Sequence, residues 1–317
     1  MRLRPTSFEP GAMSTATGLV FNEYKFNSFT LERFEGIKDQ SVICYKEDNI
    51  KVLRNYEFHN FPFFPNVLRI SQNLYCDETE VTNFHWREFL YYIKRDSSET
   101  LYLKMLPNAI SLPNNEYLFN DFYRFFPVVG ITKSQAETYL TWRTKVVNHQ
   151  LKNRQLNYNI IYRLPTEKEW EKAASGGLDV EKYPFGFQNM KVKIKINPKA
   201  TLYLKKLNNL TIPENQLTQD IKAFNKQETK VSFAFVKQDS LPYFLQYKKP
   251  FYVYNTLNNN YGLINMIGNV AEMVQEENIA KGGSFQHQLS ESEILDRILY
   301  TKSEPFIGFR AAAEIIE

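Results

Sequence analysis

The chain has 317 residues, of which 43% are hydrophobic and 23% are charged, so it can form one large folded domain or two ordinary ones. This composition is typical of a globular protein and excludes a fibrous or fully disordered chain. The formal net charge of +4 is small for this length, so nucleic-acid binding is not predicted. The sequence has no apolar run of about 18 residues or more, which excludes a predicted transmembrane segment.

The first 40 residues are rich in small and polar residues and are predicted to form an N-terminal arm. They lack the apolar core of a signal peptide, so the sequence as written predicts no export signal. Between residues 41 and 75, the runs SVICY and NVLRIS are predicted strands because they are rich in aromatic and β-branched residues. Cys44 and Cys76 are the only cysteines, and the sequence leaves open whether they form a disulfide.

Three helices are predicted next, in FHWREFLYYIKR, KSQAETYLTWRTKVVN and EKEWEKAAS. In each of them the apolar residues recur at helical spacing, and a residue that favours the N-cap position precedes them. The third helix is followed by Gly176 and Gly177, which favour a left-handed C-terminal turn. The N-cap residues, with their capping-box partners where present, are Thr82, Thr132 with Gln135, and Thr166 with Glu169.

Residues 185–260 depart from this pattern and are predicted to be a variable insertion. The run KVKIKIN alternates lysine with apolar residues and ends before Pro198. A strand that binds an anion and an edge strand protected by its lysines both explain this alternation, and the edge strand is the preferred interpretation. The following LKKLNNLTIPENQLTQD is predicted to be irregular. Asn209-Leu210-Thr211 is a glycosylation sequon, which matters only in a compartment that glycosylates proteins.

Five segments share their order along the chain with the motifs of one known family: DETEVTNFHWREFL, FPVVGITKSQAETYLTWR, YRLPTEKEWEKAASGG, NNNYGLINMIGNVAEMV, and KGGSF followed by IGFRAA. They resemble the signature of the formylglycine-generating-enzyme (sulfatase-modifying factor) family and span about residues 70–312. The resemblance implies an α+β fold related to C-type lectin-like folds, with little regular secondary structure. It implies one domain over residues 41–317, which includes the variable insertion.

Within this family, the short segments DETEVTN, WRTKVVN and STATG resemble those of envelope lipoproteins involved in gliding motility and type IX secretion in Bacteroidetes. This narrower resemblance implies a location in the cell envelope, either periplasmic or associated with the outer membrane. It also implies protein partners in an envelope complex.

Eight residues of the matching motifs are expected to have structural roles. The guanidinium of Arg163 suits a pairing with a carboxylate or with backbone carbonyls, and Trp170 and Trp142 are expected to be core aromatic residues. The glycines are expected at positions that need a positive φ or a close backbone approach. The eight residues are Arg163, Glu167, Trp170, Gly282, Gly283, Ser284, Gly308 and Arg310.

The segment GNVAEMV resembles a calcium site of the family. Carried over to this chain, the resemblance implies the side chains of Asn269 and Glu272 as ligands, together with the backbone carbonyls of Ile267, Gly268 and Val270. Oxygen ligands on a turn suit calcium, although a single carboxylate supplies little negative charge for a divalent ion. The alternative is that Asn269 only closes a turn.

The segment GGSFQHQLSES resembles the stretch that carries two copper-binding cysteines in the catalytic members of the family. His287 and Ser292 occupy those two positions, so neither is a thiol and no copper is expected. One histidine and one serine do not make a metal site, and His59, His85 and His149 have no metal-ligand spacing to His287. Ser284 lacks the GxSxG context of a serine nucleophile, so no catalytic residue is predicted.

The sequence therefore predicts a non-catalytic family member that acts as a scaffold or interaction subunit of a cell-envelope assembly. The alternative is a metal-dependent oxidoreductase of the formylglycine-generating and non-haem iron enzyme superfamily. A third hypothesis, which depends on fold analogy alone, is a carbohydrate or peptide binder that uses a cleft near NVAEMV.

Overall fold

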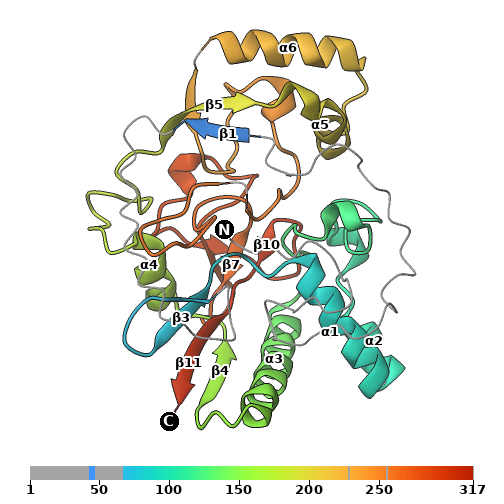
Figure 1. Cartoon of the computed structure of the whole chain (residues 1–317), viewed down its shortest axis with the longest axis vertical. Helices are drawn as coiled ribbons and strands as arrows, with labels where there is room; N and C mark the ends of the chain where they lie inside the picture. Colours follow the sequence, from blue (N-terminus) through green and yellow to red (C-terminus); the bar gives the residue numbers. More distant parts are fainter. Residues whose placement is uncertain (1–42, 47–66, 228, 255, 317) are drawn as a thin grey trace.

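The structure is a computed structural model, which describes residues 43–46 and 67–316 apart from residues 228 and 255. The N-terminal arm predicted for residues 1–40 lies outside the described residues, and so does His59. Helices and short strands are mixed along the described chain, which confirms the α+β class. Figure 1 shows three small sheets, with helices around them.

The three sheets bring together strands that are far apart in the sequence. The C-terminal sheet has the antiparallel order β2-β3-β11-β4, and the central sheet has the order β10-β7-β8-β9 with β10 parallel to β7. The insertion sheet has the antiparallel order β1-β5-β6. The strands are β1 (Ile43–Lys46), β2 (Val67–Arg69), β3 (Leu74–Asp77), β4 (Asn159–Arg163), β5 (Lys191–Ile196), β6 (Lys230–Ser232), β7 (Ala271–Met273), β8 (Ile279–Lys281), β9 (Ile298–Leu299), β10 (Ile307–Gly308) and β11 (Ala312–Ile316).

The three predicted helices are confirmed, and their N-termini lie where the sequence places them. Thr82, Thr132 and Thr166 each accept a hydrogen bond from the backbone, and the last two form complete capping boxes. None of the helices in the described ranges is both long enough and apolar enough to cross a membrane. The α-helices are α1 (Asn83–Asp96), α2 (Glu99–Met105), α3 (Lys133–Asn153), α4 (Glu167–Ser175), α5 (Thr201–Asn208) and α6 (Glu214–Lys226), and the 3-10 helices are η2 (Ala109–Ser111), η3 (Asp121–Tyr123), η4 (Pro198–Ala200), η5 (Tyr243–Leu245) and η6 (Leu289–Glu291).

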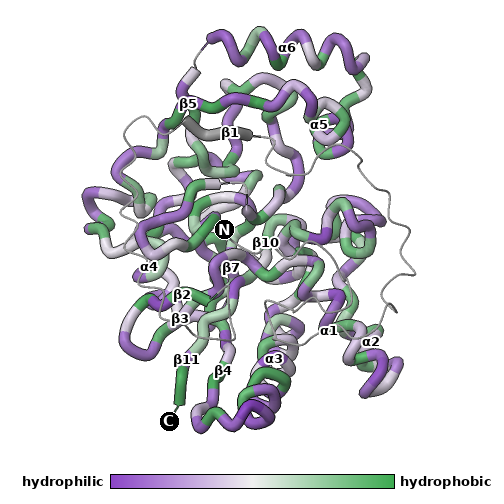
Figure 2. Tube along the Cα trace, in the orientation of Figure 1, coloured by the Kyte–Doolittle hydropathy of each residue, from purple (hydrophilic) through white to green (hydrophobic). Residues whose placement is uncertain are grey.

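Two predictions for the insertion are wrong. Strand β5 is the central strand of its sheet, between β1 and β6, so its lysines do not protect an edge. The stretch predicted to be irregular contains most of α5 and the first part of α6. Leu217, Ile221 and Phe224 are buried at helical spacing in α6, and Figure 2 shows this helix alternating between hydrophobic and hydrophilic residues.

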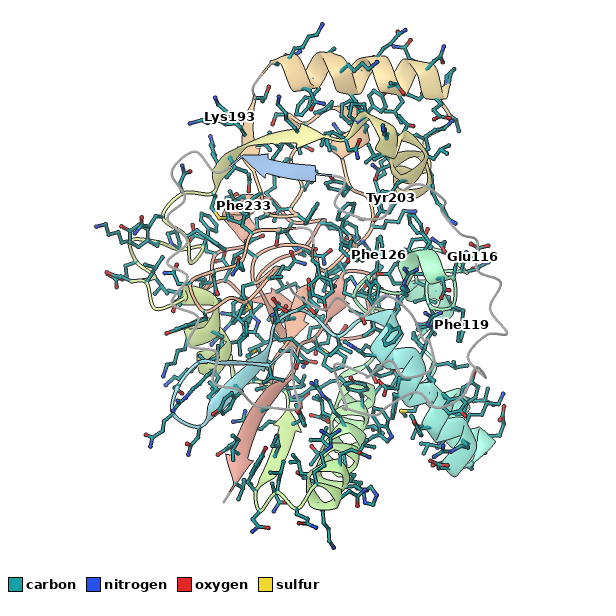
Figure 3. The ribbon with its side chains drawn as sticks, viewed as in Figure 1. Glu116, Phe119, Phe126, Lys193, Tyr203 and Phe233 are labelled. Atoms are coloured by element: carbon teal, nitrogen blue, oxygen red, sulfur yellow. The ribbon has the colours of Figure 1, made fainter. Side chains whose placement is uncertain are left out.

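The insertion shares one core with the rest of the domain. The buried face of β5 and the buried stripe of α6 belong to the same hydrophobic cluster as Trp170 and Met266. Aromatic rings connect the two parts: the Tyr203 ring centroid lies 5.0 Å from that of Phe122, and the Phe251 centroid lies 6.1 Å from that of Phe126. Aromatic side chains bury a large area each and can join loop-rich segments in this way. In Figure 3, Phe126, Tyr203 and Phe233 lie toward the interior, whereas Lys193 and Glu116 lie toward the periphery.

Candidate functional site

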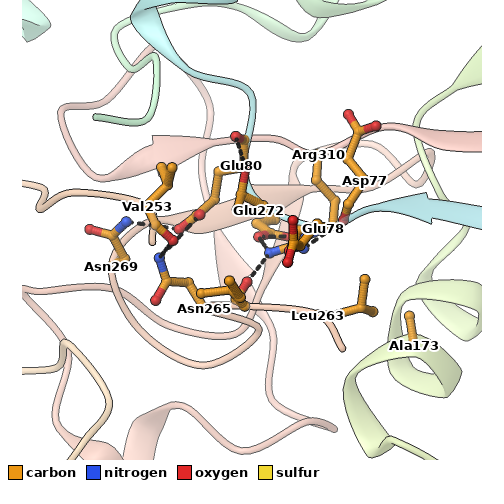
Figure 4. Close-up of polar contacts among 12 residues, drawn as sticks. Asp77, Glu78, Glu80, Ala173, Val253, Leu263, Asn265, Asn269, Glu272 and Arg310 are labelled. Carbon is orange, nitrogen blue, oxygen red and sulfur yellow. Dashed lines mark hydrogen bonds and ion pairs between the residues drawn. The ribbon is translucent and has the colours of Figure 1, made fainter. Parts of the chain in front are cut away.

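Arg310 lies at the centre of a fully buried polar network (Figure 4). Its Nη2 atom lies 2.7 Å from Glu272 Oε1, and its Nε atom lies 2.8 Å from Glu272 Oε2. Its Nη1 group donates to the backbone carbonyls of Asp77 and Glu78, and its Nη2 group also donates to the carbonyl of Ile264. A buried ion pair of this kind is stable only when both ions have their hydrogen bonds, as they do here.

The parallel pairing of β7 with β10 brings Arg310 to Glu272. Gly308 lies opposite Glu272 in the register, which places Arg310 two residues farther along the chain. A Cβ atom on Gly308 would lie 2.8 Å from the Val270 side chain, so only glycine fits without displacing that side chain. The Nε1 group of Trp170 in α4 donates to Glu272 Oε2 at 2.7 Å. The expected structural roles of Gly308, Arg310 and Trp170 therefore have a common basis in this network.

A second buried carboxylate, that of Glu80, lies beside the network. Its two oxygens accept hydrogen bonds from Asn269 Nδ2 at 2.8 Å and from Asn265 Nδ2 at 3.2 Å (Figure 4). Burial raises the pKa of Glu80 to about 8, although the positive charge of Arg310 opposes this effect. Asn269 Oδ1 in turn accepts the backbone N–H of Phe251 at 2.7 Å, so Asn269 joins three segments of the chain.

The GGS loop, residues 282–292, is tightly packed at its glycines. Gly282 and Gly283 have φ values of 86° and 66°, in the left-handed region that favours glycine. A Cβ atom on Gly282 would overlap the Met266 carbonyl oxygen, and one on Gly283 would overlap Ser292 Oγ. Both positions therefore have a backbone geometry and a close approach that glycine accommodates without strain.

The polar side chains of the GGS loop bond to one another. Ser284 Oγ lies 2.7 Å from His287 Nδ1 and accepts the backbone N–H of Gln286. Ser292 Oγ donates to the Gln288 carbonyl at 2.8 Å. Burial lowers the pKa of His287, which favours a neutral imidazole. Ser284 and Ser292 have no exposed surface, and no carboxylate within the described residues hydrogen-bonds the His287 ring, so this pair does not form a nucleophilic triad.

Two cavities flank the segment 237–248, and Gln238 lines both of them. The smaller, of about 400 Å³, lies against Phe285 and Gln286 of the GGS loop. The larger, of about 710 Å³, lies in the insertion and is lined by side chains that include Lys191, Lys230 and Tyr243. Both cavities therefore touch the GGS loop, the smaller through Phe285 and Gln286 and the larger through Leu289.

Comparison with known proteins shows what the chain is similar to. Residues 54–315 match the sequence profile of the sulfatase-modifying factor enzyme 1-like domain. The chain belongs to this family.

Individual relatives are similar over shorter stretches. The chain is 41% identical over 61 residues to the inactive C-alpha-formylglycine-generating enzyme 2 of Bos taurus, which covers 19% of this chain and 15% of that protein. It is 42% identical over 60 residues to the formylglycine-generating enzyme of Thermomonospora curvata, which covers 19% of this chain and 14% of that protein. The matches therefore span about one seventh of each of these relatives.

Solved structures of similar fold include the Treponema denticola variable protein 1, with a TM-score of 0.43 and 17% identity over 78% of this chain and 91% of that chain. PvdO from Pseudomonas aeruginosa has a TM-score of 0.44 and 15% identity over 76% of this chain and 80% of that chain.

The residues implied for the family's calcium do not fit a calcium ion. Both oxygens of Glu272 are bonded to Arg310, and one of them also accepts from Trp170. Asn269 Oδ1 accepts the Phe251 N–H, and the Asn269 carbonyl accepts the N–H of Phe285. Calcium needs about six to eight oxygen ligands, and the two side chains assigned to it have none free. Asn269 has a left-handed φ of 62° and lies in a bend, a backbone conformation that asparagine tolerates.

Within the described residues, His287 and Ser292 do not lie in a cluster with other metal ligands. His85 is buried in α1, and burial lowers its pKa to about 4, whereas His149 is exposed on α3. Cys76 is a free thiol buried in the core, and burial raises its pKa well above the usual range. The described ranges contain no group of three or more His, Cys, Asp or Glu side chains that could hold a metal ion.

Sequence reasoning missed a second buried charge cluster. Lys281 Nζ, whose side chain has no exposed surface, lies 3.0 Å from Glu167 Oε1 and 2.9 Å from Glu171 Oε1. Arg297 also binds both oxygens of Glu167, at 2.7 Å each. This cluster fixes α4 to the strand that precedes the GGS loop and explains the structural role of Glu167. The sequence feature that indicates this cluster is Lys281, which directly precedes Gly282 and Gly283.

Proposed function

We propose that this chain is a non-catalytic member of its family and acts as a scaffold or interaction subunit of a cell-envelope assembly, of the kind that serves gliding motility or type IX secretion. The proposal rests on the side chains of the GGS loop. His287 and Ser292 stand at the positions of the family's copper-binding cysteines, and their side chains bond within the loop.

The chemistry of the loop supports this choice over oxidation. A copper site of this family needs a pair of soft thiolate ligands, and imidazole with a hydroxyl does not replace such a pair. The described thiol, Cys76, is held in the core on β3, where its neutral form is favoured. Similarity to a relative whose name describes it as inactive is consistent with the proposal.

The test of inactivity uses the purified chain, a sulfatase-derived peptide that contains cysteine, and added copper. We expect no formation of the aldehyde, as followed by mass spectrometry of the peptide. The formylglycine-generating enzyme of Thermomonospora curvata is the positive control. Conversion of the peptide by this chain at a rate near that of the control would overturn the proposal.

The test of a scaffold role is affinity purification from the native cell after crosslinking. We expect the same envelope proteins, in fixed stoichiometry, in independent preparations. Gln286→Arg places a long charged side chain at the cavity beside the GGS loop without removing a side-chain contact, and Gln72→Arg makes the same change on a distant exposed glutamine. Loss of the partners with Gln286→Arg alone would locate the interaction. A chain that purifies alone in every preparation would contradict the proposal.

A further inference from the structure

One face of the insertion sheet consists of lysines. Strand β5 alternates strictly, with Val192, Ile194 and Ile196 buried on one side, so its lysines lie on the other. Strand β6 adds Lys230, which lies opposite Lys193 in the register. We call this surface the lysine face; its residues are Lys191, Lys193, Lys195 and Lys230.

This arrangement places like charges next to one another. Lys193 lies directly opposite Lys230 of β6 in the antiparallel register. Like charges directly opposite each other destabilise a sheet, because their Cβ atoms are only about 5 Å apart. Because β5 is a central strand, its lysines are not explained by protection of an edge.

Three of the four lysines of the lysine face are solvent-exposed, and Asp220 is an acidic residue that shares a cavity with Lys191 and Lys230. Lys191, Lys195 and Lys230 are exposed and form no salt bridge with a described residue. Residues 191–230 contain nine lysines and three acidic residues, a net charge of +6, whereas the whole chain has only +4. The positive charge of the molecule is therefore concentrated in the insertion.

The kind of cation identifies the kind of partner. Residues 191–230 contain no arginine. Arginine is enriched and lysine depleted in protein–protein interfaces, and arginine also makes the bidentate contacts that read guanine in DNA. Lysine is a strongly hydrated point charge, which suits diffuse attraction to a surface of many anions.

We propose that the lysine face is a docking surface for a membrane with anionic headgroups. Tyr243, which is 39% exposed, lines the 710 Å³ cavity together with Lys191 and Lys230, so an amphipathic aromatic side chain lies beside the basic surface. The Tyr243 hydroxyl donates to Asp220, which lines the same cavity, and the exposed part of the ring beside the lysines suits the headgroup region of a bilayer.

The experiment measures binding of the full chain to phosphatidylcholine vesicles with and without phosphatidylglycerol, by flotation at low and high salt. We expect binding only to the anionic vesicles, and loss of that binding at high salt. The triple variant Lys191→Gln, Lys195→Gln, Lys230→Gln should bind about a hundredfold more weakly, since each lysine near such a surface contributes about fivefold.

A matched control separates the lysine face from net charge. Lys104→Gln, Lys152→Gln and Lys168→Gln remove the same charge from exposed positions on α2, α3 and α4. This variant should bind anionic vesicles within about threefold of the unaltered chain. Neither triple variant should lower the melting temperature of the unaltered chain, because none of the six side chains takes part in a salt bridge with a described residue.

Three outcomes would overturn the inference: no binding of the unaltered chain to anionic vesicles, equal loss in the two triple variants, or equally tight binding to a DNA duplex at the same salt. The inference depends on the proposed envelope location only for the membrane that the chain would meet in the cell. Vesicle binding needs no partner protein, so its failure and the failure of the purification experiment are separate results.

Discussion

At the scale of single residues, the sequence predicts contacts that are local and misses those that depend on strand pairing. The sequence predicts that Arg163 pairs with a carboxylate or with backbone carbonyls, and it binds both oxygens of Glu169 at 2.7 and 2.8 Å. Glu169 is six residues away and is itself the capping-box residue of α4, so the pairing follows from local geometry. Arg310 and Glu272 are 38 residues apart, and only the pairing of β7 with β10 brings them together.

The first prediction concerns the buried ion pair. Arg310→Met should lower the free energy of unfolding by about 3–5 kcal/mol, because it leaves the buried Glu272 carboxylate without its counter-charge. Urea unfolding measures this loss. The double variant with Glu272→Met should lose less than the sum of the two single variants. Additive losses would show that the two charges are not coupled.

The second prediction concerns pH. The pKa of Glu80 is about 8 in the folded chain, against about 4.3 in an unfolded chain. Between these pH values the unfolded chain has released a proton that the folded chain keeps, so stability should fall as the pH rises. The contribution of Glu80 is at most about 1.4 kcal/mol per pH unit.

Unfolding by urea across this pH window compares the unaltered chain with Glu80→Gln. We expect the variant to show the shallower decline toward pH 8, because it has no proton to lose. Glu181→Gln, on an exposed side chain, should leave the slope unchanged. A slope that is the same in all three proteins would rule out Glu80 as its cause.

At the scale of elements, helix starts were predictable and the neighbours of strands were not. A capping box lies within four residues, so Thr132 and Thr166 identify their helices without the rest of the fold. Helix α6 was missed because its N-cap is Pro213, which makes no side-chain hydrogen bond, although its apolar spacing was visible. The place of β5 could not be predicted, since β1 lies about 150 residues earlier in the chain.

The third prediction tests the cap of α4. Thr166→Ala should lower the free energy of unfolding by about 1 kcal/mol, because the backbone N–H of Glu169 loses its acceptor. Thr141→Ala makes the same change inside α3, where the hydroxyl donates to the Glu137 carbonyl and caps no helix. It should leave stability unchanged within about 0.5 kcal/mol. Equal effects of the two substitutions would contradict a specific role of the cap.

At the scale of the whole molecule, five ordered motifs were enough to predict the family and the fold class, and four of them supply residues of the Arg310 network. DETEVTN supplies Glu80 and two of the carbonyls, NVAEMV supplies Glu272, and GFR supplies Arg310 itself. The pairing of Glu272, a candidate calcium ligand, with Arg310 could not be predicted from the sequence, because it depends on which segments pack together.

The fourth prediction follows for metal binding. Because the side-chain oxygens of Glu272 and Asn269 are bonded to protein groups, neither calcium nor a chelator should shift the melting temperature of the chain by more than about 1 °C. Differential scanning calorimetry with calcium and with EDTA measures this. A rise of several degrees with calcium, absent in Glu272→Gln, would restore the calcium site that the family resemblance implies.

Strand β1 has a practical consequence for anyone who shortens this protein. The family match begins at residue 54, whereas β1 occupies Ile43–Lys46. A truncated chain that starts at the family boundary would lose this strand and leave the backbone groups of β5 without their partners along that side. Such a fragment would be prone to self-association through the uncovered strand, so expression should start upstream of residue 43.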